Sequence, residues 1–252
     1  MNHILQFIPF GLVETPAHKG YEQSSPFTRP EGWRVHRGTF EEQRADLVKH
    51  LERAGYVRTE PVRKAMLAVH REEFVPTVVQ QASYADHPLD IGHGQTISAP
   101  HMVAIMVEAM RAKEGQRVLE IGGGLGYHAA VMAHVVGEYG HVFAVERLEP
   151  LAERARANLE GAGLADRVTV LVGDGSCGWS EYAPYDRISV ACAAPYVPEP
   201  MLMELADGGM LLVPVGGRYV QELTRITRVG TKFRKEGLGG CVFVPLVGKC
   251  GH

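Results

Sequence analysis

The chain has 252 residues, of which 45% are hydrophobic, so it can bury the core of one domain and a small addition. Its 26 basic and 29 acidic residues are interspersed and sum to a net charge of −3, which excludes the basic surface that nucleic acid or an anionic membrane requires. The four cysteines form no C-x-x-C pair, so we expect reduced thiols, no disulfide and no metal site. We also expect neither a membrane span nor a secretory signal peptide.

The N-terminal part begins with a segment of low order. Residues 1–38 are rich in Pro, Gly and Ser and show no helical or strand period, so we expect an arm that is disordered or packs on another surface. Order is expected from Thr39, where TFEE predicts a capping box between Thr39 and Glu42. The helix that follows should end at Gly55, and a second helix should begin near Pro61.

From residue 99 onward helical and strand-like patterns alternate. This order predicts an α/β fold with a mostly parallel twisted sheet and helices on both faces. The expected strands are 117–121, 141–145, 167–172 and 187–192, and the expected helices are 127–136, 149–160 and 199–206. Three further strand-like runs, MLLVPV, VQELTRIT and CVFVPLV, predict antiparallel pairing at the C-terminal end of the sheet.

The stretch RVLEIGGGLGYHAAV places a glycine-rich turn between a strand and a helix. Without side chains, such a turn lets a ligand lie against the backbone and the helix N-terminus. The dinucleotide pattern G-x-G-x-x-G fails from Gly122, but from Gly124 it is completed by Ala129. The turn by itself therefore leaves a nicotinamide cofactor open.

Acidic residues follow three successive predicted strands. Glu120 ends the first strand, where its carboxylate suits an ammonium group such as that of S-adenosylmethionine. Glu146 follows the second strand, where it can accept from ribose hydroxyls, and Asp174 follows the third, where it can accept from adenine. One such acid is better explained as a surface charge or helix cap, but three in these positions indicate one site. The pattern E-x-G-x-G-x-G with these acids resembles the S-adenosylmethionine-dependent methyltransferases of the Rossmann-like class.

The segment DIGHGQTISAPHMVA precedes this core. Its plain interpretation is a helix start, with Ser98 as the N-cap and Pro100 in the first turn. However, PLDIGHGQTISAPHMVA, REEFVP, VLEIGGGLGYHAAV, VERLEPLAERARANL, GDGSCG, APYDRISVACAAP, GGMLLVPVG and VFVPLVG occur in the order found in one family. From about Thr39 to Gly248 the chain resembles the protein-L-isoaspartate O-methyltransferases.

The resemblance implies transfer of a methyl group from S-adenosylmethionine to the α-carboxylate of an isoaspartyl residue, which starts repair through a succinimide and leaves S-adenosylhomocysteine. Ser98 matches the active-site serine. The residues implied for the cofactor are Gln95, Thr96, Ile97, Glu120, Gly122, Gly124, Gly126, Glu146, Arg147, Asp174, Gly175 and Gln221. Those implied for the substrate are Ser98, His101, Val244, Pro245 and Leu246.

The division expected from these motifs is an arm at 1–38, a helical subdomain with a substrate-side loop at 39–98, and a cofactor-binding core with C-terminal substrate strands at 99–252. We expect a cytoplasmic monomer that acts on isoaspartyl proteins and peptides and binds neither nucleic acid nor membrane. Because a carboxylate is already ionised at neutral pH, no general base is needed. Ser98 is then a hydrogen-bond donor, and His93, His101 and His128 have structural or substrate-edge roles.

Three alternatives remain open on these grounds. An aspartyl methyltransferase acting on a dedicated peptide would have a similar active site. An adaptor that binds the cofactor without turnover would keep the fold. A nicotinamide-dependent oxidoreductase would use the glycine turn differently.

Overall fold

A computed structural model describes residues 38–252, and the predicted arm therefore lies outside the described residues except for Gly38. The described helices are α1 (Phe40–Arg53), α2 (Glu60–Ala68), α3 (Pro100–Met110), α4 (Tyr127–Val136), α5 (Glu149–Gly161) and α6 (Glu199–Met203), with short 3₁₀ turns η1 (Arg71–Phe74), η2 (Thr77–Ala82) and η3 (Ser180–Tyr182). The strands are β1 (Leu89–Gly92), β2 (Gln95–Ile97), β3 (Arg117–Ile121), β4 (His141–Glu146), β5 (Val168–Val172), β6 (Tyr185–Val190), β7 (Leu205–Gly216), β8 (Gln221–Val229) and β9 (Lys232–Cys241).

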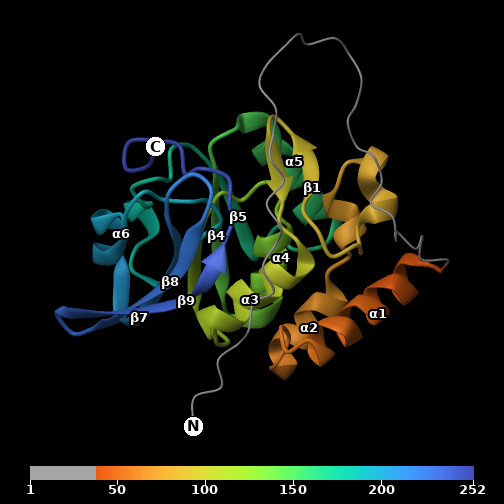
Figure 1. Cartoon of the computed structure of the whole chain (residues 1–252), viewed down its shortest axis with the longest axis horizontal. Helices are drawn as coiled ribbons and strands as arrows, with labels where there is room; N and C mark the ends of the chain where they lie inside the picture. Colours follow the sequence, from red (N-terminus) through yellow and green to blue (C-terminus); the bar gives the residue numbers. More distant parts are fainter. Residues whose placement is uncertain (1–37) are drawn as a thin grey trace. The chain divides into compact units, whose positions relative to one another are not determined.

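Seven strands form the main sheet in the order β5-β4-β3-β6-β7-β8-β9 (Figure 1). The first five are parallel, and β8 and β9 continue the sheet in antiparallel fashion, which confirms the predicted fold class. Since side chains alternate along a strand, β3 sends Val118 to one face and Leu119 to the other. The first face is covered by α3, α4 and α5, and the second is covered partly by α6.

The predicted N-terminal helices are confirmed. The Thr39 hydroxyl accepts from the backbone N–H of Glu42, and the Glu42 carboxylate accepts from the backbone N–H of Thr39, so the capping box is formed. A proline, Pro61, stands at the start of α2, and the apolar face of α2 packs against α4. These two helices, orange in Figure 1, therefore lie beside the helical layer of the sheet.

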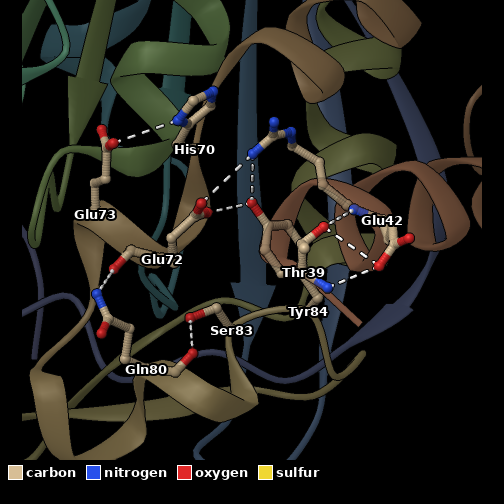
Figure 2. A network of polar contacts seen from close by, with 9 residues as sticks. Thr39, Glu42, His70, Glu72, Glu73, Gln80, Ser83 and Tyr84 are labelled. Carbon is tan, nitrogen blue, oxygen red and sulfur yellow. Dashed lines mark hydrogen bonds and ion pairs between the residues drawn. The ribbon is translucent and has the colours of Figure 1, made fainter. Parts of the chain in front are cut away.

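A polar network joins α1 to the chain that leads toward the sheet (Figure 2). Arg44 of α1 donates to the Tyr84 hydroxyl at 3.1 Å and lies 3.5 Å from the Glu72 carboxylate. Tyr84 in turn donates to Glu72, while Gln80 donates to the Glu72 backbone carbonyl. Arg44 and Glu72 are both buried, so each charged side chain provides the opposite charge that compensates the other.

The last predicted strand is wrong in position. The last strand of the sheet is β9, which contains only the first residue of CVFVPLV, Cys241, and the rest of that run forms an isolated bridge between Pro245 and Ala193. Pro245 has no N–H with which to continue a ladder. The sequence of β9, KFRKEGLGGC, lacks the apolar alternation of a half-buried strand, and its first six residues are exposed. Backbone pairing with β8 across a tight turn at Gly230 defines it instead.

The expectation of reduced cysteines without a disulfide is also wrong. Cys177, after β5, and Cys250, near the C-terminus, form a disulfide with their Cα atoms 5.2 Å apart. They are separated by 73 residues, so no spacing rule along the chain reveals that they meet. Cys192 and Cys241 remain free thiols. Within residues 38–252, no helix is long and apolar enough to cross a membrane.

Candidate active site

One pocket lies at the carboxyl ends of β3, β4 and β6. The chain passes from β3 outward to β4 and β5 and then returns to the other side of β3 as β6, so the sheet order reverses at this point. Ligands of open α/β sheets bind in the crevice that such a reversal creates. The space between the residues that line the pocket is about 930 Å³, which includes the space open to solvent at its mouth.

The glycine turn forms the floor of this pocket. Gly122 has φ +87°, and a Cβ atom placed on it would approach the Cys192 sulfur to 2.7 Å. Gly124 has φ +55°, in the left-handed region that favours glycine. The N–H groups of Gly122 and Gly123 both donate to the carbonyl of Val145, which ties the turn to β4. These residues are glycine because of close approach and backbone conformation.

Glu146, the last residue of β4, faces the turn from the neighbouring strand. Its Oε2 accepts from the N–H of Gly124 at 2.9 Å, and its Oε1 accepts from the N–H of Leu148 at 2.8 Å. Each oxygen has a second lone pair, so the oriented carboxylate can accept two further hydrogen bonds from a ligand. Two neighbouring ribose hydroxyls present that pair of donors.

Glu120 stands one residue before the end of β3 and is only 1% exposed. Its Oε1 lies 3.1 Å from Nδ1 of His128, near the start of α4, and both side chains line the pocket. Among the residues that the structure describes, neither Glu120 Oε2 nor His128 Nε2 has a hydrogen-bond partner. The pocket therefore contains a buried carboxylate oxygen available to a ligand.

Asp174 follows β5 but does not line the pocket, unlike its neighbours Gly175 and Ser176. Its Oδ1 accepts from the N–H of Ser176 and its Oδ2 from the N–H of Lys249, each at 2.9 Å. Partial burial acts to raise the pKa of Asp174, but these N–H groups outweigh it and hold the pKa below its ordinary value. Asp174 therefore orders the loop beside the pocket and joins it to the C-terminal tail.

The opposite wall comes from the short hairpin β1–β2 and the turn after it. Gln95, Thr96, Ile97 and half-buried Ser98 all line the pocket. The interpretation of Ser98 as an N-cap is wrong, because α3 begins with Ala99 as its N-cap and no side chain caps it. Pro100 forces the residue before it into extended backbone, so the helix begins one residue later than predicted. The Ser98 hydroxyl is thus not used in capping.

Arg71 supports the Ser98 turn from behind. Its side chain is 0% exposed, and its Nη2 donates to the Ser98 carbonyl and its Nε to the Ser83 carbonyl, each at 2.8 Å. The guanidinium lies 4.8 Å from the ring centroid of Tyr127, which lines the pocket. Ser83 belongs to the segment shown in Figure 2, so the polar network around Glu72 leads through Arg71 to the pocket wall.

Most of the predicted site residues lie together. Those that line the pocket are Gln95, Thr96, Ile97, Ser98, Glu120, Gly122, Gly124, Glu146, Arg147, Gly175, Val244, Pro245 and Leu246. Gly126 does not line it but is the N-cap of α4, and Gln221 is buried with its side-chain amide bound to Gly217 and Phe243. His101 is bound to Asp86, whose carboxylate accepts a hydrogen bond from the backbone N–H of His101 at 2.9 Å.

Several lining residues were not among the predicted cofactor or substrate residues, and His128 was expected to have only a structural or substrate-edge role. Tyr127 and His128 directly follow the glycine turn, so their position in the sequence could have indicated them. Cys192 follows β6 and lies within APYDRISVACAAP, but that segment gave it no role at the site. Burial, reinforced by Glu146 and Glu120, raises the pKa of Cys192 to about 12, so its thiol is protonated and not a nucleophile at neutral pH. No group of three or more potential metal ligands occurs within residues 38–252.

The arrangement fits S-adenosylmethionine. The open oxygen of Glu120 suits an ammonium group, Glu146 suits the ribose, and the glycine turn lets the ligand approach the backbone. A mostly parallel sheet that carries this site at its reversal point defines a Rossmann-like methyltransferase that depends on S-adenosylmethionine.

Comparisons with known proteins identify the family. Residues 42–251 match the family model of protein-L-isoaspartate(D-aspartate) O-methyltransferase. The protein-L-isoaspartate O-methyltransferase of Hyperthermus butylicus is 52% identical, with 90% of this chain and 95% of that protein covered. The enzyme of the same name from Methanosarcina mazei is 53% identical, with 84% and 86% covered. This chain therefore belongs to the protein-L-isoaspartate(D-aspartate) O-methyltransferase family and is a methyltransferase enzyme.

Solved structures agree. A protein-L-isoaspartate O-methyltransferase with 34% identity superposes with a TM-score of 0.75 over 82% of this chain and 67% of that chain. A structure from Plasmodium falciparum, described as the same kind of enzyme in complex with S-adenosyl-L-homocysteine, is 26% identical with a TM-score of 0.71, covering 81% of this chain and 98% of that chain. The expectation of S-adenosylmethionine as cofactor is thus confirmed, and the nicotinamide alternative is set aside.

Proposed function

We propose that this enzyme methylates the α-carboxylate of L-isoaspartyl residues in damaged proteins and peptides and so begins their repair through a succinimide. One observation carries the proposal: the Ser98 turn and the glycine turn line the same pocket. The family and its named relatives at about 50% identity support the same activity.

On the cofactor side of the pocket, individual residues can be assigned to the parts of S-adenosylmethionine. We assign Glu120 to the ammonium group of the methionine part, Glu146 to the ribose, and Gly175 with the Asp174 loop to the adenine side. Gln95, Thr96, Ile97 and Arg147 complete the walls, and Gly122, Gly124 and Gly126 shape the turn. Gln221 acts from a distance, because it holds the backbone at Phe243 just before the wall formed by Val244. When bound, S-adenosylmethionine supplies an activated methyl group and is converted to S-adenosylhomocysteine.

On the acceptor side, the chain orients an anion that is already reactive. An aspartyl-type carboxyl group has an ordinary pKa near 3.9, so at neutral pH it needs no general base. The half-buried Ser98 hydroxyl donates a hydrogen bond to this carboxylate and sets its direction. Arg71 fixes the turn by holding the Ser98 carbonyl at 2.8 Å. Such positioning supplies roughly 7–11 kcal/mol of barrier lowering in well-oriented reactions.

The substrate peptide lies along Val244, Pro245 and Leu246, with His101 at the edge. This stretch is extended and bonded to Ala193 through Val244 and Leu246. Leu246 and Ile97 are buried apolar residues in the pocket wall, so they reduce access of water to the reacting groups. In this assignment residues 39–98 form the substrate-side subdomain and residues 99–252 the cofactor-binding core.

We further propose that the enzyme is a cytoplasmic monomer and that isoaspartyl proteins and peptides are its partners, with neither nucleic acid nor membrane among them. The net charge of −3 supports the absence of polyanion binding. The Cys177–Cys250 disulfide is unusual for that compartment, in which stable disulfides are common mainly in hyperthermophiles.

The test is a radiolabelled methyl-transfer assay on one isoaspartyl peptide and its normal aspartyl isomer. We expect transfer to the isoaspartyl form alone. Preference for a normal aspartyl peptide would favour the alternative of an aspartyl methyltransferase with a dedicated substrate. Tight cofactor binding without transfer to either peptide would favour the adaptor.

A further inference from the structure

Two buried polar side chains flank the glycine turn. Glu120 lies on β3 just before the turn, and His128 lies on α4 just after it. Their contact, 3.1 Å from Glu120 Oε1 to His128 Nδ1, closes the turn at its base. Glu120 is 1% exposed and His128 is 8% exposed, so bulk water does not satisfy either one.

The pair is left incomplete toward the pocket. Within the described residues, Glu120 Oε2 and His128 Nε2 have no hydrogen-bond partner. A buried carboxylate without full hydrogen bonding is unfavourable, and structures keep such a group where a ligand completes it. Both side chains line the pocket, so the ligand of the pocket is what can complete them.

The charges around the pair favour a cationic ligand. Glu146, 7% exposed, is a second carboxylate on the same wall, and Arg147 is the nearby basic residue on that wall. Burial raises the pKa of Cys192, and the negative charges of Glu146 and Glu120 raise it further. Both carboxylates therefore lie close enough to act electrostatically on the same point in the pocket. An ammonium group placed there would reduce the repulsion between two buried anions.

We propose that His128 is a positioning residue for cofactor recognition. It holds one oxygen of Glu120 through Nδ1 so that the other oxygen faces the ammonium group of the methionine part of S-adenosylmethionine. This inference rests on the proposed function, because it assumes that the pocket binds that cofactor. His128 acts through Glu120 and gives the pocket preference for ligands that carry the amino-acid moiety over ligands that carry only the nucleoside.

His128→Asn, His128→Leu and Glu120→Gln test this assignment. Asparagine can place an amide N–H near the position of Nδ1, leucine cannot donate, and glutamine keeps the shape of Glu120 without its charge. Two probes are titrated calorimetrically: S-adenosylhomocysteine, which has the ammonium group, and methylthioadenosine, which has the same nucleoside and sulfur without the amino-acid part.

We expect His128→Leu and Glu120→Gln to weaken S-adenosylhomocysteine binding by about tenfold, the scale of one lost charge-assisted hydrogen bond. Methylthioadenosine affinity should change by less than about twofold, and His128→Asn should restore most of the loss. Unchanged methylthioadenosine binding also shows that the variant pocket is folded.

An equal loss for both probes in His128→Leu would mean that His128 only packs the helix, and no loss for either would mean that it does not position Glu120. Each of these results overturns the inference while leaving methyl transfer by the wild type intact. Failure of the proposed function is separate, since the wild type would then transfer no methyl group to the isoaspartyl peptide.

Discussion

Removal of the Cys177–Cys250 disulfide should destabilise the enzyme substantially. The bond joins residues 73 positions apart, and the paired serine variant Cys177→Ser/Cys250→Ser removes it. In the chain-entropy description, closing a loop of this length stabilises the folded state by about 4 kcal/mol. For a domain of this size, 1 kcal/mol corresponds to about 2–4 °C in Tm, so we expect a fall of about 8–16 °C.

The consequence should extend to the pocket. The tail ordered by the disulfide also donates from Lys249 to Asp174 and from Cys250 to Ser176, and Ser176 lines the pocket. When the tail is released, these donors are no longer held in place. We therefore expect weaker binding of S-adenosylhomocysteine by the serine pair as well as a lower Tm.

Calorimetry of the wild type with and without a dithiol reductant, beside the serine pair under both conditions, measures the effect. Reduction should lower the Tm of the wild type and leave that of the serine pair unchanged. In the unfolded wild type, thiol titration before reduction should find Cys192 and Cys241, and titration after reduction and removal of the reductant should find all four cysteines. A wild type and serine pair with equal Tm values would refute the reasoning.

Three further outcomes concern single side chains. Ser98→Ala should lower kcat at least tenfold and change cofactor affinity little, since the loss of one donor to a charged group is worth about 1.5–3 kcal/mol; unchanged kcat in steady-state assays would exclude its orienting role. Glu146→Ala should raise the Kd for S-adenosylmethionine about tenfold or more, because it removes a ribose acceptor and frees the N–H groups of Gly124 and Leu148; an unchanged Kd by calorimetry would move the ribose elsewhere. The Asp174 pKa is lowered in the folded state, so its contribution to stability is present above the unfolded value of 3.8 and is lost as pH falls through the folded value. Acid unfolding of Asp174→Asn should show a smaller loss of stability over that range than the wild type, and identical pH profiles would contradict the assignment.

The sequence alone determined the order and type of the central elements. Strands β3, β4 and β6 are largely buried on both faces, so each appears as a short apolar run, and the partly buried edge strand β5 is apolar as well. The glycine turn and the capping box mark helix starts. The glycine turn and the strand-end acids were indicated by local pattern, whereas the TIS segment was indicated by the family resemblance. Parallel strands bring their carboxyl ends to one edge, which explains why the glycine turn, Glu120 and Glu146 meet in one pocket, although Asp174 lies outside its lining.

Tertiary structure alone decided the features that depend on pairing between distant residues. β9 is held by backbone hydrogen bonds to β8 rather than by apolar alternation, and Cys177 meets Cys250 because the C-terminal tail returns to the loop after β5. Likewise, only the packing of η1 shows that Arg71 supports Ser98. The pairing of Glu120 with His128 also depends on how the turn closes. Local sequence records the conformational preference of each segment, whereas contacts across the fold depend on the relative positions that the complete core imposes.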